Sequence, residues 1–189
     1  MLLTTILLLF LTQKTFADSD TAKSYCVMNS VTGEIVAEKE SDTKLPMAST
    51  TKIMTLLVAL ENSNPEDVVT VSKTAVSEEG SSAYLKPGAR ITMRDLCYGL
   101  MLNSGNDAAV AIAEHISETT DDFAEFMNDT AKRTGILNTH FVNPNGLHDD
   151  NHFTTASDLA RLTRYALQND TFREIVSSGM YTSTMLMPD

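Results

Sequence analysis

The chain has 189 residues, of which 42% are hydrophobic and 21% are charged, and its net charge at pH 7 is -11. This composition fits one globular domain with a real core and argues against a disordered chain. An acidic surface repels phosphate groups, so nucleic acid is excluded as an expected partner and anionic lipid is disfavoured. The sequence contains no internal repeat and no low-complexity tract.

The N-terminal segment is strongly apolar. Residues 1–11 are nearly all hydrophobic, and Thr15-Phe16-Ala17 ends in a small residue. This pattern is typical of a secretory signal peptide over residues 1–17, with cleavage after Ala17. The apolar run is too short for a confident membrane span, although an uncleaved N-terminal anchor is the alternative. Both interpretations predict an exported domain, preceded by a polar linker over residues 18–23.

The first half of the chain predicts a hairpin followed by a buried helix. Residues 25–29 and 35–38 read as two short strands joined by a turn over residues 31–34. Residues 40–46 form a polar loop. Residues 49–61 have almost no polar face, which is typical of a helix buried on all sides, and Asn62-Ser63-Asn64-Pro65 ends it.

The second half is mainly helical. We expect a strand over residues 67–71, a loop over 77–83 and a turn at Pro87-Gly88. Further elements are predicted by periodicity: helices over 92–103 (capped by Thr92), 107–118, 121–133 and 155–168, a loop over 139–153 and a helical turn over 172–176. This order predicts an α+β fold, with a helical cluster packed on an antiparallel sheet. Because so few strands cannot cover these helices, the C-terminal strands of that sheet are expected to be missing from this sequence.

The sequence contains two cysteines, Cys26 and Cys97. In an oxidising compartment they could pair. Both have apolar neighbours, however, which favours two buried free thiols. Their spacing is not that of a metal site.

A serine nucleophile needs a base within hydrogen-bond reach, and residues three apart on a helix share a face. Two Ser-x-x-Lys segments meet this spacing, Ser41 to Lys44 and Ser49 to Lys52. The first lies in a polar loop, where its lysine would stay solvated and charged. The second opens the buried helix, where burial would lower the pKa of Lys52 and let its neutral amine take the Ser49 proton. The alternative is a capping serine and a lysine that reaches the surface.

A second polar break, Ser104-Gly105-Asn106, separates two predicted helices. A break between buried helices can point side chains into a cleft, where Ser104 could relay a proton and Asn106 could hold a substrate amide. Serine, glycine and asparagine are also ordinary turn residues, so a simple helix-linking turn is the alternative.

The two motifs occur in the order seen in penicillin-recognising serine enzymes. Four segments carry a closer resemblance, at residues 46–55, 102–109, 138–148 and 154–160. They resemble the D-alanyl-D-alanine carboxypeptidases, the S11 peptidase family of the penicillin-binding and β-lactamase-like superfamily. The resemblance covers nearly all of residues 25–176 and implies that superfamily's fold.

The resemblance implies a mechanism. Ser49 would be the acyl-ester nucleophile, Lys52 its proton acceptor, and Ser104 would pass the proton to the leaving D-alanine. Asn106 would help to fix the substrate and Lys52. The substrate would be the D-alanyl-D-alanine end of a peptidoglycan stem peptide on the cell-wall side of the membrane, and β-lactams would trap Ser49. Neither a metal nor an organic cofactor is implied, and any C-terminal membrane attachment would lie beyond Asp189.

The sequence departs from the family pattern in one respect. The family's third motif is Lys-Thr-Gly on a later strand, which binds the substrate carboxylate and supplies an oxyanion donor, and this sequence does not contain it. Arg133-Thr134-Gly135 ends a predicted helix, with Gly135 as its C-cap. Residues 24–189 are therefore expected to be the N-terminal portion of the catalytic domain, and the activity of this portion stays open. The alternatives are a serine β-lactamase, a catalytically inactive penicillin-binding fragment and a related endopeptidase.

The histidines need a separate interpretation. His148 and His152 are four apart with two aspartates between them, a spacing at which metal ligands occur. The surrounding Asn-Pro and Asn-Gly pairs indicate a loop and not a metal-binding helix, so a metal site is not favoured. We expect His115 and His140 to be structural.

Overall fold

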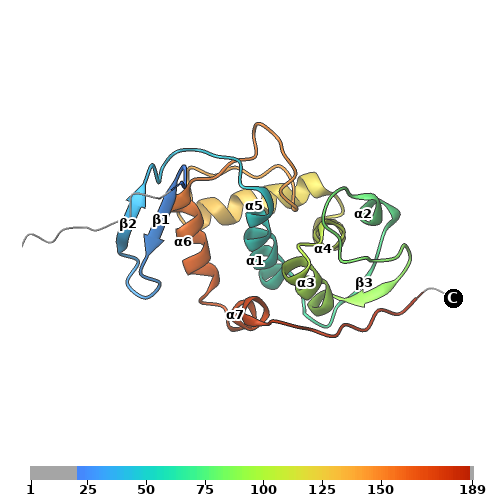
Figure 1. The fold of residues 1–189 in the computed structure, drawn as a ribbon. Coiled ribbons are helices and arrows are strands. Elements are labelled where there is room, and N and C mark those ends of the chain that lie inside the picture. The colour runs from blue at the N-terminus through green and yellow to red at the C-terminus, as the bar shows by residue number, and fades with distance from the viewer. Residues whose placement is uncertain (1–20, 188–189) are drawn as a thin grey trace, which may run out of the picture.

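The computed structural model describes residues 21–187. The signal peptide predicted over residues 1–17, and residues 18–20 of the predicted linker, lie outside this range. Within it, helices form the body of the molecule and short strands lie at its two ends (Figure 1). None of the helices in residues 21–187 is long and apolar enough to cross a membrane.

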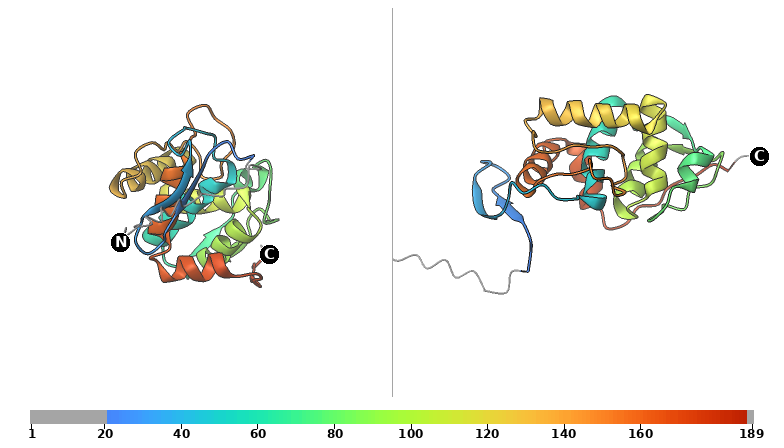
Figure 2. Two further views of the ribbon diagram at one scale, coloured as in Figure 1. Left: turned by 60° about the vertical axis from the view of Figure 1, so that its left-hand side comes forward. Right: turned by 90° about the horizontal axis from the view of Figure 1, so that it is seen from above.

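The predicted N-terminal hairpin is confirmed. Strand β1 (Tyr25–Met28) pairs antiparallel with β2 (Ile35–Lys39), with Tyr25 opposite Lys39. The turn is closed by Asn29, whose side-chain oxygen accepts hydrogen bonds from the backbone N–H groups of Val31 and Thr32. An asparagine that binds its own following backbone in this way is a local turn signal. The hairpin lies beside α6 at one end of the molecule (Figures 1 and 2).

The buried helix is also confirmed, as α1 (Lys52–Asn62). It occupies the centre of the fold and contacts five surrounding helices: α3 (Met93–Leu102), α4 (Asn106–Ser117), α5 (Thr120–Arg133), α6 (Ala156–Ala166) and α7 (Asp170–Ser177). The side chains from Met54 to Ala59 are buried all round the helix. A helix without a polar face is stable only when neighbours cover it on every side, and α3 to α7 do so here.

The start of this helix differs from the prediction. Residues Ala48–Thr51 form a separate 3₁₀ turn, η1, and the α-helix begins only at Lys52. Ala48 has a φ of 47° and cannot continue a right-handed helix, while Thr50 donates its N–H to the carbonyl of Met47 at 3.2 Å. Ser49 therefore lies in the tighter turn that precedes the helix.

The prediction missed a second small sheet and a short helix. β3 (Val68–Thr70), which was predicted, pairs antiparallel with β4 (Arg90–Thr92), which was not. Between them lies α2 (Lys73–Ser77), capped by the Ser72 hydroxyl. A three-residue strand whose partner is far along the chain carries no local hairpin signal. The outcome is an α+β arrangement with a two-stranded antiparallel sheet at each end of the helical body.

Three smaller predictions were tested. Thr92 caps α3, as expected, and accepts a hydrogen bond from the Asp95 N–H at 3.1 Å. Both cysteines are free, and burial raises the pKa of the Cys97 thiol to about 12. Cys26, however, is only half-buried, which corrects the prediction of two buried thiols. Within residues 21–187 only β2 pairs with β1, so Cys26 lies along an open groove.

Candidate active site

The structure separates the two Ser-x-x-Lys segments. Ser49 is exposed at the surface, and its Oγ lies 3.3 Å from Nζ of Lys52, which is only 2% exposed. Ser41 instead donates its hydroxyl to the carboxylate of Glu38 at 2.6 Å, and Lys44 lies over the ring of Phe153 at the surface. Only Ser49 therefore combines access from solvent with a buried amine at its side.

The amine of Lys52 has three hydrogen-bond partners. Besides Ser49, Nζ lies 2.7 Å from Oδ1 of Asn106 and 2.7 Å from the carbonyl oxygen of Asn145. Burial lowers the pKa of Lys52 to about 8, against the opposing effect of the Asp107 carboxylate. A neutral amine keeps two N–H donors and gains one lone pair. The two shorter contacts use the two donors, which leaves the lone pair directed at the Ser49 hydroxyl.

Asn106 is held in one orientation at the first turn of α4. Its Oδ1 accepts from Lys52, while its Nδ2 donates to the carbonyl of Glu79. Gly80 follows at a φ of 93°, and a Cβ there would lie 2.8 Å from the amide nitrogen of Asn106. The loop can therefore approach Asn106 this closely only with glycine at position 80. The consequence is a fixed acceptor for Lys52.

Ser104 lies in the same motif but is not bonded to the other three residues. Its backbone has a φ of 53°, and its Oγ is buried without a hydrogen-bond partner among the described residues. A buried hydroxyl left unpaired costs about 1–3 kcal/mol, and an unusual backbone conformation adds to this cost. The structure thus brings Ser49, Lys52 and Asn106 together and leaves the Ser104 hydroxyl free to bind a further group.

Sequence reasoning did not single out Asp107. Its buried carboxylate accepts hydrogen bonds from the hydroxyl of Ser82 at 2.7 Å and from the N–H groups of Ala83 at 2.8 Å and Leu85 at 3.1 Å. It thereby ties residues 82–85 to α4, next to Asn106. An acidic residue in the first turn of a helix is too common a signal to have revealed this role.

Asn145 was also missed, because the segment Asn143-Pro144-Asn145-Gly146 was interpreted only as a loop. Its carbonyl accepts from Lys52, and its side chain donates to the Glu78 carboxylate at 2.7 Å. A backbone carbonyl has no sequence signature, so only the tertiary structure could identify this partner.

The structure places His148 and His152, whose spacing is one at which metal ligands occur, in different environments. His148 is exposed and lies 3.6 Å from the Asp150 carboxylate. His152 is buried, and its Nε2 lies 2.7 Å from Oγ1 of Thr51, two residues after Ser49. The two rings therefore have different partners, and His152 belongs to the surroundings of Ser49.

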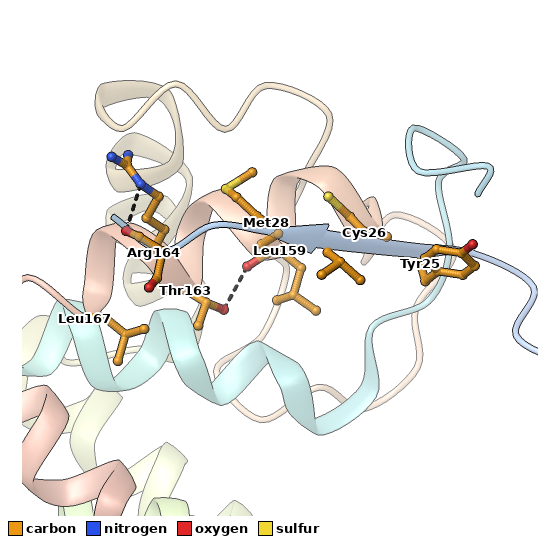
Figure 3. Close-up of a pocket in the computed structure, with 11 residues that line it drawn as sticks. Tyr25, Cys26, Met28, Leu159, Thr163, Arg164 and Leu167 are labelled. Carbon is orange, nitrogen blue, oxygen red and sulfur yellow. Dashed lines mark hydrogen bonds between the residues drawn. The ribbon is translucent and has the colours of Figure 1, made fainter. Parts of the chain in front are cut away.

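A separate groove of about 560 Å³ lies between β1 and α6 (Figure 3). Cys26 and Met28 line it from the strand, Leu159 lines it from the helix, and Leu167 lines it from the C-cap position directly after the helix. Arg164 closes one end by donating to the carbonyl of Ser30 at 3.1 Å. None of the residues that line this groove belongs to the cluster around Ser49.

Comparison with known proteins gives a consistent result. The family model of the S11 peptidases, described as D-alanyl-D-alanine carboxypeptidase, matches residues 12–186. The carboxypeptidase DacF of Bacillus subtilis is 36% identical over 162 residues, which are 83% of this chain and 42% of DacF. DacC of Escherichia coli is 37% identical over 157 residues, which are 77% of this chain and 39% of DacC.

Solved structures agree with these sequence matches. The D-alanyl-D-alanine carboxypeptidase DacD from Francisella tularensis has a TM-score of 0.79 and 41% identity, covering 82% of this chain and 39% of that protein. The DD-transpeptidase of Streptomyces K15 has a TM-score of 0.80 and 36% identity, covering 86% of this chain and 66% of that protein. The chain therefore spans about two fifths of the length of DacF, DacC and DacD. Since the match includes both the Ser49 and the Ser104 segments, the chain belongs to the S11 family of D-alanyl-D-alanine carboxypeptidases.

Proposed function

We propose that this chain carries the nucleophile and proton-transfer groups of a serine-type D-alanyl-D-alanine carboxypeptidase. One observation carries the proposal: the buried Lys52 amine is bonded to both Ser49 Oγ and Asn106 Oδ1. The names of the curated relatives support the same activity. The substrate class is the D-alanyl-D-alanine end of a peptidoglycan stem peptide. The apolar N-terminus supports export to the cell-wall side of the membrane.

The first step is acylation of Ser49. The Oγ attacks the carbonyl carbon of the D-alanyl-D-alanine bond, and its proton passes to the neutral amine of Lys52. At pH 7 about one tenth of an amine with a pKa of about 8 is neutral, so the base is available without a metal or cofactor. Asn106 and Asn145 hold the two remaining N–H groups of Lys52, which keeps the lone pair aligned.

The second step is departure of the terminal D-alanine. The C–N bond breaks, and the leaving nitrogen takes a proton that Ser104 relays from Lys52. The unpaired, buried hydroxyl of Ser104 supports this role, because its donor and acceptor are both unused and it lies two residues before Asn106 in the chain. Water then attacks the Ser49 ester and releases the shortened peptide. In the family pattern, carboxylate binding and the oxyanion contact belong to the Lys-Thr-Gly motif, which this sequence does not contain.

The group that would activate water for hydrolysis of the acyl-enzyme distinguishes a carboxypeptidase from a β-lactamase. Fast hydrolysis of a penicilloyl ester requires a carboxylate placed to activate water. The β-lactamases of this fold carry that carboxylate in a Glu-x-x-Leu-Asn type segment, and this sequence has no such segment after Ser104-Gly105-Asn106. We therefore expect penicillin to acylate Ser49 and to remain attached.

Intact-mass measurement of residues 18–189 after incubation with penicillin tests the proposal. The expected result is a mass increase of one drug molecule, mapped to Ser49. Ser49→Ala should abolish the adduct, whereas Ser41→Ala, a matched control with the same Ser-x-x-Lys spacing, should retain it. An adduct that survives Ser49→Ala would overturn the site assignment, and rapid loss of the adduct by hydrolysis would favour the β-lactamase.

A further inference from the structure

The segment that carries Ser49 packs against the loop over residues 140–154. Gly146 of this loop packs directly on Ala48, where a Cβ at position 146 would lie 2.0 Å from the carbonyl oxygen. A second contact joins Thr51 to His152. The two elements are therefore in van der Waals and hydrogen-bond contact on both sides of Ser49.

The hydrogen bonds fix the tautomer of His152. The backbone N–H of Val142 donates to Nδ1 at 3.0 Å, so Nδ1 must be the unprotonated nitrogen. Nε2 then carries the proton and donates to Oγ1 of Thr51 at 2.7 Å. The Thr51 hydroxyl in turn donates to the carbonyl of Ala48 at 2.8 Å. Each group in this series of hydrogen bonds therefore has a defined donor or acceptor role. The series ends at the carbonyl of Ala48, the residue before Ser49.

The series of hydrogen bonds holds Ala48, which has an unusual backbone conformation. Its φ of 47° lies in the left-handed region, which a residue with a Cβ adopts at a cost of about 1–2 kcal/mol. Ser49 follows directly, so the conformation of Ala48 sets the direction in which the serine leaves the backbone. Strained residues of this kind persist only where surrounding contacts hold them.

We propose that His152 is a positioning residue for Ser49. Through Thr51 it holds the Ala48 carbonyl, and so keeps the serine hydroxyl beside the amine of Lys52. The inference rests on the proposed role of Ser49 as nucleophile. Burial lowers the pKa of His152 to about 4, so the ring stays neutral and keeps this tautomer at neutral pH.

A thiol at position 49 gives a direct readout of this geometry. In a Ser49→Cys protein that also carries Cys26→Ser, the remaining Cys97 is buried and its thiol pKa is raised, so it should not react. The apparent thiol pKa, taken from the pH profile of iodoacetamide alkylation, should lie below its ordinary value of about 8.5 because the Lys52 ammonium stabilises the thiolate. His152→Phe should raise this pKa by about one unit, which slows alkylation about tenfold at pH values below the pKa.

Three further variants distinguish positioning from space filling. His152→Gln, whose side-chain amide can still donate to Thr51, should restore most of the lowered thiol pKa. Thr51→Val should reproduce the effect of His152→Phe, and the two together should add little. Ala48→Gly should weaken the effect of His152→Phe, because glycine adopts a positive φ without a cost. The control His140→Phe, in the same loop, should leave the thiol pKa unchanged.

One result would overturn the inference: a thiol pKa that is the same in the parent and in His152→Phe while both are folded by circular dichroism. A lowered melting temperature with an unchanged thiol pKa would assign His152 to packing against Phe141. Alkylation does not require penicillin. A chain that forms no penicillin adduct but whose thiol pKa responds to His152 would count against acylation by residues 18–189 and retain the positioning role.

Discussion

Acid should weaken this protein through His152. The imidazole has a pKa of about 4 in the folded chain, lowered by burial, against 6.5 as its ordinary value. Asp149 raises the pKa and His140 lowers it, and both effects are smaller than that of burial. As the pH falls from 6.5 to about 4, the unfolded chain takes up the proton first, so the free energy of unfolding falls. The stabilisation is fully present above pH 6.5.

The magnitude follows from the two pKa values. The total loss is about 3 kcal/mol below pH 4, and about 2 kcal/mol of it occurs between pH 7 and pH 5. Urea unfolding at these two pH values, compared between the wild-type chain and His152→Gln, isolates this contribution because all other titrating groups are shared. The wild-type chain should lose about 2 kcal/mol more than the variant between these two pH values.

Equal losses in the two proteins would refute the reasoning, since the imidazole would then titrate alike in the folded and unfolded chains. A matched control is His140→Gln. His140 lies in the same loop, and its Nδ1 donates a hydrogen bond to the carbonyl of Asn151. This variant keeps the imidazole of His152, so between pH 7 and pH 5 it should lose more stability than His152→Gln does.

Two further predictions concern the amine of Lys52 and the loop that packs on Ala48. The rate of penicillin acylation should rise about tenfold between pH 7 and pH 9, because the neutral fraction of Lys52 grows from about one tenth to about nine tenths as the pH passes its pKa of about 8. A rate that does not change with pH, measured by quenching the labelling reaction at successive times, would argue against Lys52 as the base. Gly146→Ala should lower the free energy of unfolding by about 2–4 kcal/mol in urea titrations, because its Cβ would meet the Ala48 backbone at 2.0 Å and the φ of 92° disfavours alanine. Gly179→Ala, where no atom lies within 4 Å, should have little effect, and equal stability of the two variants would contradict the packing argument.

Several features of the fold follow from local sequence. The hairpin is specified by two β-rich runs and by Asn29, which closes its own turn. Helix α1 is specified by the absence of a polar face, and α3 by the capping hydroxyl of Thr92. The pairing of β3 with β4 joins distant segments and has no local signal, because a three-residue strand such as β4 is defined by its partner and not by its own pattern.

The same division applies to the site. The spacing of Ser49 and Lys52, together with the apolar residues that follow, determined which serine has a buried amine beside it, and the order of the motifs indicated the family. The tertiary structure decided how that amine is oriented. Asn145 contributes a backbone carbonyl from a loop more than 90 residues away, and His152 reaches Thr51 from the same loop. Contacts of this kind depend on how the loop packs over the nucleophile segment. A backbone carbonyl is chemically the same at every position, so its role is set only when folding brings it to a partner.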